Sequence, residues 1–197
     1  MTISLILPMI AFAIAASISP GPVNLVCLSS GSRYPLSKGL IFVTGATLGF
    51  IALFITIGMG LYSVLSVVPG FNAFLRWAGV TFLLYLSFLL FRDDGRLPED
   101  EKRKAPGFIT GVIMQWVNPK AWLASASGIG AYTSGHDLHE VIVFATLYMP
   151  ICWLSLSCWV YAGVYLRRYV QRPIVLVTLN RVLAFLLAAS CIYLLIE

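Results

Sequence analysis

Two proline-containing triplets interrupt apolar stretches of the chain, PGP at residues 20–22 and NPK at residues 118–120. Proline has no backbone N–H and glycine disfavours the helical state, so each triplet predicts a break in a helix. A break frees backbone donors and acceptors, and the half-helix that follows carries partial positive charge at its N-terminus. Where two such N-termini meet in apolar surroundings, they can bind an anionic group such as a carboxylate.

Amide side chains and one cation accompany the two triplets. Asn24 follows the first triplet, Gln115 precedes the second, and Lys120 belongs to the second. A cation inside a membrane helix costs about 2.5–3.5 kcal/mol on insertion scales, so it normally faces a cavity or a partner. The alternative for Lys120 is that its side chain extends to the outer aqueous surface. The candidate substrate-binding residues are therefore Pro20, Gly21, Pro22, Asn24, Gln115, Asn118, Pro119 and Lys120.

Composition identifies the surroundings of these residues as a lipid bilayer. Hydrophobic residues make up 59% of the 197 residues and charged residues only 11%, whereas a soluble protein carries roughly 25% charged residues. A spanning helix needs about 20 apolar residues. We therefore predict an all-α integral membrane protein with no room for a soluble domain. Its six transmembrane helices are expected at about 3–28, 39–65, 71–91, 107–131, 139–166 and 176–196.

Lysine and arginine fall almost entirely in alternate loops. If the N-terminus lies outside, eleven of the 13 are at the cytoplasmic side, Arg76 is outside, and Lys120 lies within a helix. This asymmetry follows the positive-inside rule and predicts that both termini are periplasmic. Basic residues spread over short loops argue against nucleic-acid binding. The N-terminus lacks the basic region of a signal peptide, so we expect it to stay as the first helix.

The order of the helices predicts an inverted repeat. One transporter domain at 1–197 would comprise a first repeat at about 1–91, a cytoplasmic linker at about 92–106 and a second repeat at about 107–197. With three helices in each repeat, the second repeat starts in the opposite direction from the first. The two triplets then interrupt helices one and four at matching places. The plainer alternative is two unrelated proline kinks, because prolines are common in membrane helices.

The other reactive side chains give no sign of catalysis or of metal binding. The four cysteines lie in apolar segments without metal-ligand spacing, so we expect free, buried thiols and no metal. All eight acidic residues fall in loops or at the C-terminus, and both histidines lie in one polar loop. An intramembrane enzyme would need a nucleophile with a base, so we expect neither an enzyme nor a cofactor. An anionic or zwitterionic solute with a neutral side chain suits these residues best.

Two segments resemble the LysE/RhtB family of amino-acid exporters: SPGPVNLVCLSSGSRYPLSKGLIFVTGATLGF at 19–50 and QWVNPKAWL at 115–123. The resemblance covers the whole length and implies a secondary transporter of the bacterial inner membrane. It also implies export driven by a coupled proton or by exchange. Many members carry an acidic residue where this chain has Phe50. That departure makes the chain look more similar to the cysteine and O-acetylserine exporter subgroup, which implies small neutral amino acids as substrates.

Other functions are compatible with parts of the sequence. An exporter of homoserine or threonine would share the motifs. A passive small-solute channel would share the broken helices and would lack saturable counterflow. A structural or assembly protein would be insensitive to changes at the breaks. The glycine stripe Gly39, Gly45 and Gly49 predicts close helix packing, and it allows a homodimer without requiring one.

Overall fold

The computed structural model is entirely helical in its regular elements over the part of the chain that it describes. That part comprises residues 5–61, 68–70, 105–133 and 138–169, with scattered positions at 73–92 and 174–188. The bounded helices are α1 (Ile6–Ile18), α2 (Pro22–Arg33), α3 (Leu36–Gly58), α6 (Phe108–Trp116), α7 (Pro119–Tyr132) and α8 (Leu138–Tyr169). Of these, α3 and α8 are each long and apolar enough to cross a membrane. Helices α1 and α2 together are a candidate for a third span, with a bend of 60° between them.

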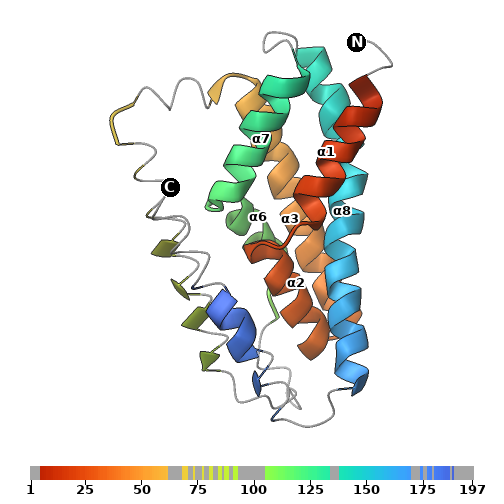
Figure 1. The fold of residues 1–197 in the computed structure, drawn as a ribbon, viewed down its shortest axis with the longest axis vertical. Helices are drawn as coiled ribbons and strands as arrows, with labels where there is room; N and C mark the ends of the chain where they lie inside the picture. Colours follow the sequence, from red (N-terminus) through yellow and green to blue (C-terminus); the bar gives the residue numbers. More distant parts are fainter. Residues whose placement is uncertain are drawn as a thin grey trace.

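The two predicted helix breaks are confirmed. Pro22 is in the first turn of α2, where its fixed φ suits a helix and its missing N–H leaves no bond unmade. Pro119 has the same place in α7, and the side chain of Asn118 caps that helix by accepting from the Lys120 backbone N–H at 3.2 Å. Both breaks lie at about mid-height of the bundle, with α1 and α7 on one side and α2 and α6 on the other (Figure 1).

The polar stretch at 29–38 separates its helices less than the sequence predicts. Helix α2 continues through Arg33 instead of ending near residue 28, and α3 begins at Leu36 instead of residue 39. The reason is packing against α8. Gly31 has no side chain, so the end of α2 lies directly against the backbone of α8, where a Cβ at residue 31 would lie 2.0 Å from the carbonyl oxygen of Val160. This contact holds the end of α2 in a helical conformation. Helix α3 ends at Gly58, and Gly60 has a φ of 92° just beyond it; residues 62–65 of the predicted helix lie outside the described residues.

Each of the two broken helix pairs, α1–α2 and α6–α7, packs against the long helix from the other half of the sequence. Helices α1 and α2 contact α8, helices α6 and α7 contact α3, and α3 contacts α8 (Figure 1). Glycine allows the closest approaches. A Cβ on Gly45 of α3 would lie 2.0 Å from the Phe108 carbonyl oxygen of α6, and a Cβ on Gly163 of α8 would lie 2.1 Å from the Leu28 carbonyl oxygen of α2.

The predicted glycine stripe is confirmed as a packing surface, and it packs inside the protomer. Gly45 and Gly49 lie against α6, and Gly39 lies against the Val160 side chain of α8. These three glycines are therefore not the surface on which a homodimer would form.

The predicted helices at 71–91 and 176–196 lie largely outside the described residues. The described parts of these two segments are neighbours, because the Ser87 hydroxyl donates to the Ala184 carbonyl oxygen at 2.8 Å. Gly70, with a φ of 85°, lies in a turn just before the first of them. The count of six spans and the inverted repeat stay predictions.

The cysteine prediction holds for two residues and fails for one. Cys27 and Cys152 are free and buried, whereas Cys158 is free and exposed. Helix α8 buries Leu156 and Val160, and a residue two positions from both points to the opposite side of a helix. Cys191 lies outside the described residues.

Candidate functional site

The two breaks adjoin a small cavity between the broken helix pairs, α1–α2 and α6–α7, and helices α3 and α8. Its volume is about 40 Å³, which is room for about three water molecules and less than an amino acid occupies. Four of the eight predicted site residues line it: Asn24, Gln115, Asn118 and Lys120. The predicted residues that shape the breaks without lining the cavity are Pro20, Gly21, Pro22 and Pro119.

The carbonyl groups at the end of α1 accept hydrogen bonds from side chains of other elements. Asn24 Nδ2 of α2 donates to the Ser17 carbonyl oxygen at 2.8 Å, and Trp159 Nε1 of α8 donates to the Ile18 carbonyl oxygen at 3.1 Å. The last four carbonyls of a helix have no partner within that helix. In the membrane interior such groups need partners from the protein, and side chains supply them here.

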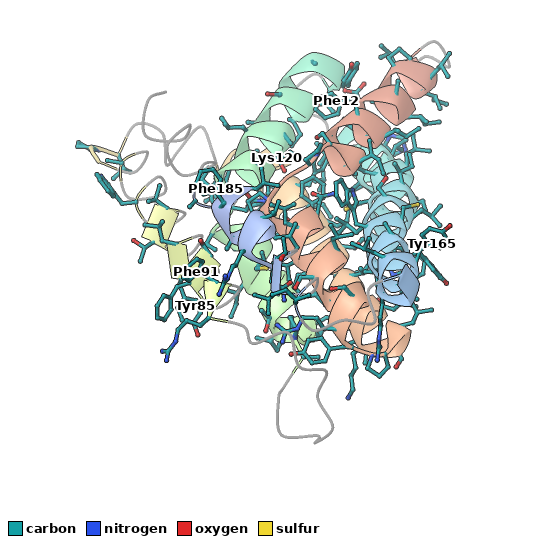
Figure 2. The ribbon with its side chains drawn as sticks, turned by 60° about the horizontal axis from the view of Figure 1, so that its bottom comes forward. Phe12, Tyr85, Phe91, Lys120, Tyr165 and Phe185 are labelled. Carbon is teal, nitrogen blue, oxygen red and sulfur yellow. The ribbon has the colours of Figure 1, made fainter. Side chains whose placement is uncertain are left out.

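Lys120 completes this set from the other half of the chain (Figure 2). Its Nζ donates to the carbonyl oxygen and to the hydroxyl of Ser19, both at 2.8 Å, and to the Pro20 carbonyl oxygen at 3.2 Å. Lys120 lies in the first turn of α7, so a cation from the second half stabilises the partial negative charge at the C-terminus of α1. The side chain turns toward α1 instead of extending to the surface.

Gly21 makes this approach feasible. A Cβ at residue 21 would lie 3.1 Å from both Cδ and Nζ of Lys120. The backbone of Gly21 is extended, with a φ of −169°, which any residue can adopt. Glycine is therefore favoured here because a Cβ would crowd the lysine side chain that lies over it, and not because of its conformational freedom.

The N-terminus of α2 has donors without acceptors. Pro22 has no N–H, Gly21 gives no side-chain cap, and the hydrogen bond from Leu25 N–H to the Gly21 carbonyl oxygen is the first of this turn. The N–H groups of Val23 and Asn24 thus lack an acceptor among the described residues, and both residues line the cavity. The N-terminus of α7, by contrast, carries a side-chain cap. A ligand anion would therefore find its free donors at α2.

Gln115 adds an unpaired amide to the same cavity. Its side chain is only 5% exposed and forms no hydrogen bond with any residue that the structure describes. The Gln115 amide is not among the fully buried, unpartnered side-chain atoms of the described residues, which are the hydroxyls of Ser30, Ser125 and Ser157. A ligand in the cavity can therefore reach the Gln115 amide and hydrogen-bond to it.

An aromatic pair forms the apolar wall. Phe50 of α3 is 4% exposed and packs edge-on against Tyr148 of α8, with ring centroids 4.7 Å apart and planes at 89°. The cavity therefore combines a polar wall from the broken helices with an apolar wall from α3 and α8. This combination fits a small solute with charged ends and a neutral side chain.

Sequence reasoning missed every residue that α3 and α8 contribute to the cavity, and it missed Ser17 of α1. The missed residues of the long helices include Tyr148, Cys152 and Leu156. Nothing local distinguishes them from other core residues of the same helix, because only the packing of α8 against α1 and α2 brings them to the breaks. Phe50 had a signal, its departure from the family pattern, although the sequence alone did not predict that it lines the site.

The cavity is cationic over the part of the chain that the structure describes. Lys120 is the charged residue among its lining residues, and no carboxylate joins it. Among the described residues, no three histidine, cysteine or acidic side chains lie close enough together to hold a metal ion. One predicted loop acid, Glu140, lies instead in the first turn of α8, because the positive end of a helix favours an acidic residue.

Comparisons with known proteins agree with these features. The sequence profile of the family described as LysE type translocator matches residues 14–197. The chain is 25% identical to the cysteine/O-acetylserine efflux protein of Klebsiella pneumoniae subsp. pneumoniae over 195 residues, 98% of this chain and 96% of that protein. It is 24% identical to the protein of that name from Salmonella typhimurium over 154 residues, 77% of this chain and 78% of the relative. No solved structure matches the chain significantly.

Proposed function

This chain belongs to the LysE type translocator family, and on that premise we propose that it exports small neutral amino acids or close derivatives across the bacterial inner membrane. Cysteine and O-acetylserine are the first candidates, because the similar efflux proteins are named for them. The observation that carries the proposal is the convergence of unpaired α2 donors, the Gln115 amide and Lys120 at one cavity. Family membership supports a transporter and not an enzyme.

The proposed binding mode uses the two walls of the cavity separately. The substrate carboxylate would accept from the Val23 and Asn24 N–H groups and from Gln115, where a helix N-terminus favours an anion. The substrate side chain would lie against Phe50 and Tyr148. Their apolar surface favours a small neutral group and leaves a cationic side chain without a carboxylate partner.

We also propose the six-span inverted repeat with both termini in the periplasm. The reciprocal packing of each broken helix pair on the long helix of the other half supports it, because a pseudo-two-fold axis between the repeats would exchange those two contacts. The neighbouring positions of Ser87 and Ala184 agree with a third and a sixth helix that are symmetry mates. The distribution of lysine and arginine supports the orientation.

The experiment is counterflow in proteoliposomes. Vesicles with the purified protein are loaded separately with cysteine, O-acetylserine, serine, threonine, homoserine or lysine, and release is recorded with and without a pH gradient. We expect saturable, stereoselective release of cysteine or O-acetylserine and no release of lysine. Release of homoserine or threonine alone would contradict the substrate assignment. Unsaturable release of every solute would identify a channel, and equal release in both pH conditions would show that transport is not coupled to protons.

Gly21→Ala is expected to slow release of the transported solute by about tenfold, the size of one weakened charge-assisted hydrogen bond. The new methyl group would lie 3.1 Å from Lys120 Cδ and Nζ, and it would crowd any ammonium group that binds the Ser19 and Pro20 oxygens at that position. Gly107→Ala is the matched control, because nothing lies within 4 Å of a Cβ at that residue. Initial rates at equal protein density decide the matter, and an unchanged rate in Gly21→Ala would contradict the role given to the glycine.

A further inference from the structure

The contacts of Lys120 describe a binding site for a primary ammonium group. The carbonyl oxygen and hydroxyl of Ser19 and the carbonyl oxygen of Pro20 lie 2.8, 2.8 and 3.2 Å from one nitrogen. An ammonium group has three N–H donors and no acceptor, so three oxygens at these distances satisfy it completely. The three oxygens belong to the break in the first span, and the nitrogen that fills them belongs to the second half of the chain.

A second observation concerns what this arrangement leaves unsatisfied. The buried amide of Gln115 and the N–H groups of Val23 and Asn24 lack partners among the described residues, and all three residues line the cavity. The carbonyl groups of residues 17–20, by contrast, all accept from side chains. The site therefore offers unused donors to a carboxylate, while its acceptors for an ammonium group are already taken by Lys120.

We propose that the oxygens of Ser19 and Pro20 form the subsite for the substrate ammonium group, and that Lys120 occupies this subsite when the transporter is empty. When substrate binds, its ammonium group takes the three oxygens, and Lys120 Nζ turns to the substrate carboxylate. Lys120 Nζ then has the three oxygens as acceptors in the empty state and the substrate carboxylate in the bound state, so neither ammonium group is left without an acceptor. This inference rests on the proposed function, and it adds a chemical requirement to it.

The requirement is that a transported solute carries both a free primary ammonium group and a carboxylate. A solute without the ammonium group cannot replace Lys120 on the oxygens. A solute without the carboxylate gives the displaced Lys120 no partner. In addition, the hydrogen bonds of Lys120 connect α7 to the end of α1. Only a zwitterion would break these bonds and still give both the oxygens and the Lys120 ammonium group a new partner.

Two isomers test the ammonium requirement directly. O-Acetylserine and N-acetylserine have the same atoms, but only the first has a free ammonium group. In proteoliposomes at mildly acidic pH, where the acetyl group stays on oxygen, we expect N-acetylserine to be released at least about tenfold more slowly. Equal saturable release of both isomers would overturn the inference while leaving the proposed export function in place.

A binding measurement on purified protein separates the inference from transport. Cysteamine has the ammonium group and thiol of cysteine and lacks the carboxylate. It should bind Lys120→Met, in which the subsite is free, at least about tenfold more tightly than wild type, because a competing charged donor is gone. Lys38→Met is the control, since Lys38 is exposed in the first turn of α3.

Isothermal titration with cysteamine reads out this comparison in detergent. Tighter binding to Lys120→Met alone supports the subsite. Equal or weaker binding to Lys120→Met overturns it. If no amino acid is released from proteoliposomes, the proposed function fails, and the cysteamine comparison still decides whether the oxygens accept an external ammonium group.

Discussion

Lys120→Met is expected to lower the release of the transported amino acid by at least about 100-fold while the protein remains folded in the membrane. Methionine keeps an apolar stem over Gly21 and removes the ammonium group that contacts Ser19 and Pro20. The substrate carboxylate then loses its charged partner. Removing one member of a buried, hydrogen-bonded charge pair costs about 2–5 kcal/mol, and 1.4 kcal/mol corresponds to a factor of about ten.

The measurement is the initial rate of counterflow at equal protein density, with the folded fraction checked by size-exclusion chromatography. Lys38→Met removes an exposed cation at the start of α3 and should transport at the wild-type rate. Wild-type transport by Lys120→Met would contradict the site as a whole. A loss of transport in both variants would point to a general effect of net charge instead of to the cavity.

Gly45→Ala is expected to destabilise the protein by about 1–3 kcal/mol, the usual range for overpacking a close contact. A Cβ at residue 45 would lie 2.0 Å from the carbonyl oxygen of Phe108. Because the clashing atom belongs to the backbone, no side-chain rotation can relieve it, and α6 must move away from α3. Since α6 leads directly into the second break, the cavity should change shape as well.

Gly130→Ala is the matched control for Gly45→Ala. Gly130 also lies within a helix, α7, and no atom lies within 4 Å of a Cβ built on it. This substitution should be neutral or should stabilise the helix by about 0.5–1 kcal/mol, because alanine has the higher helix propensity. Thermal unfolding in detergent compares the two variants with wild type. Equal stability of both variants would contradict the close packing of α3 on α6.

The places where the helices break could be predicted from the sequence, because proline acts locally. Pro22 and Pro119 each begin a half-helix at the expected residue. Polar residues next to the breaks were also good candidates, and Asn24 and Gln115 line the cavity. A polar side chain in an apolar segment is costly to bury without a hydrogen-bond partner, so it is expected to face a polar cavity. Composition and local pattern therefore sufficed to predict this part of the site.

The identity of the partners could not be predicted, because it depends on tertiary packing. The sequence predicts two half-helix N-termini that bind an anion together, yet the Asn118 side chain caps the N-terminus of α7. The Lys120 ammonium group donates to the carbonyl oxygen of Ser19 at the end of α1. Likewise, Tyr148 reaches the cavity only because α8 lies along the first broken span. Helical periodicity ranks the faces of one helix and says nothing about which residues of another helix they meet.

The bond between Lys120 and the end of α1 also has a consequence for how the chain is made. Ribosomes deliver residues 19 and 20 to the membrane a hundred positions before their partner exists. Until then, the carbonyl groups of residues 19 and 20 must accept hydrogen bonds from water or from another protein, because an unsatisfied carbonyl in hydrocarbon costs several kcal/mol. The first half thus enters the bilayer before these carbonyl groups have their protein partner, and insertion of the second half supplies that partner, Lys120.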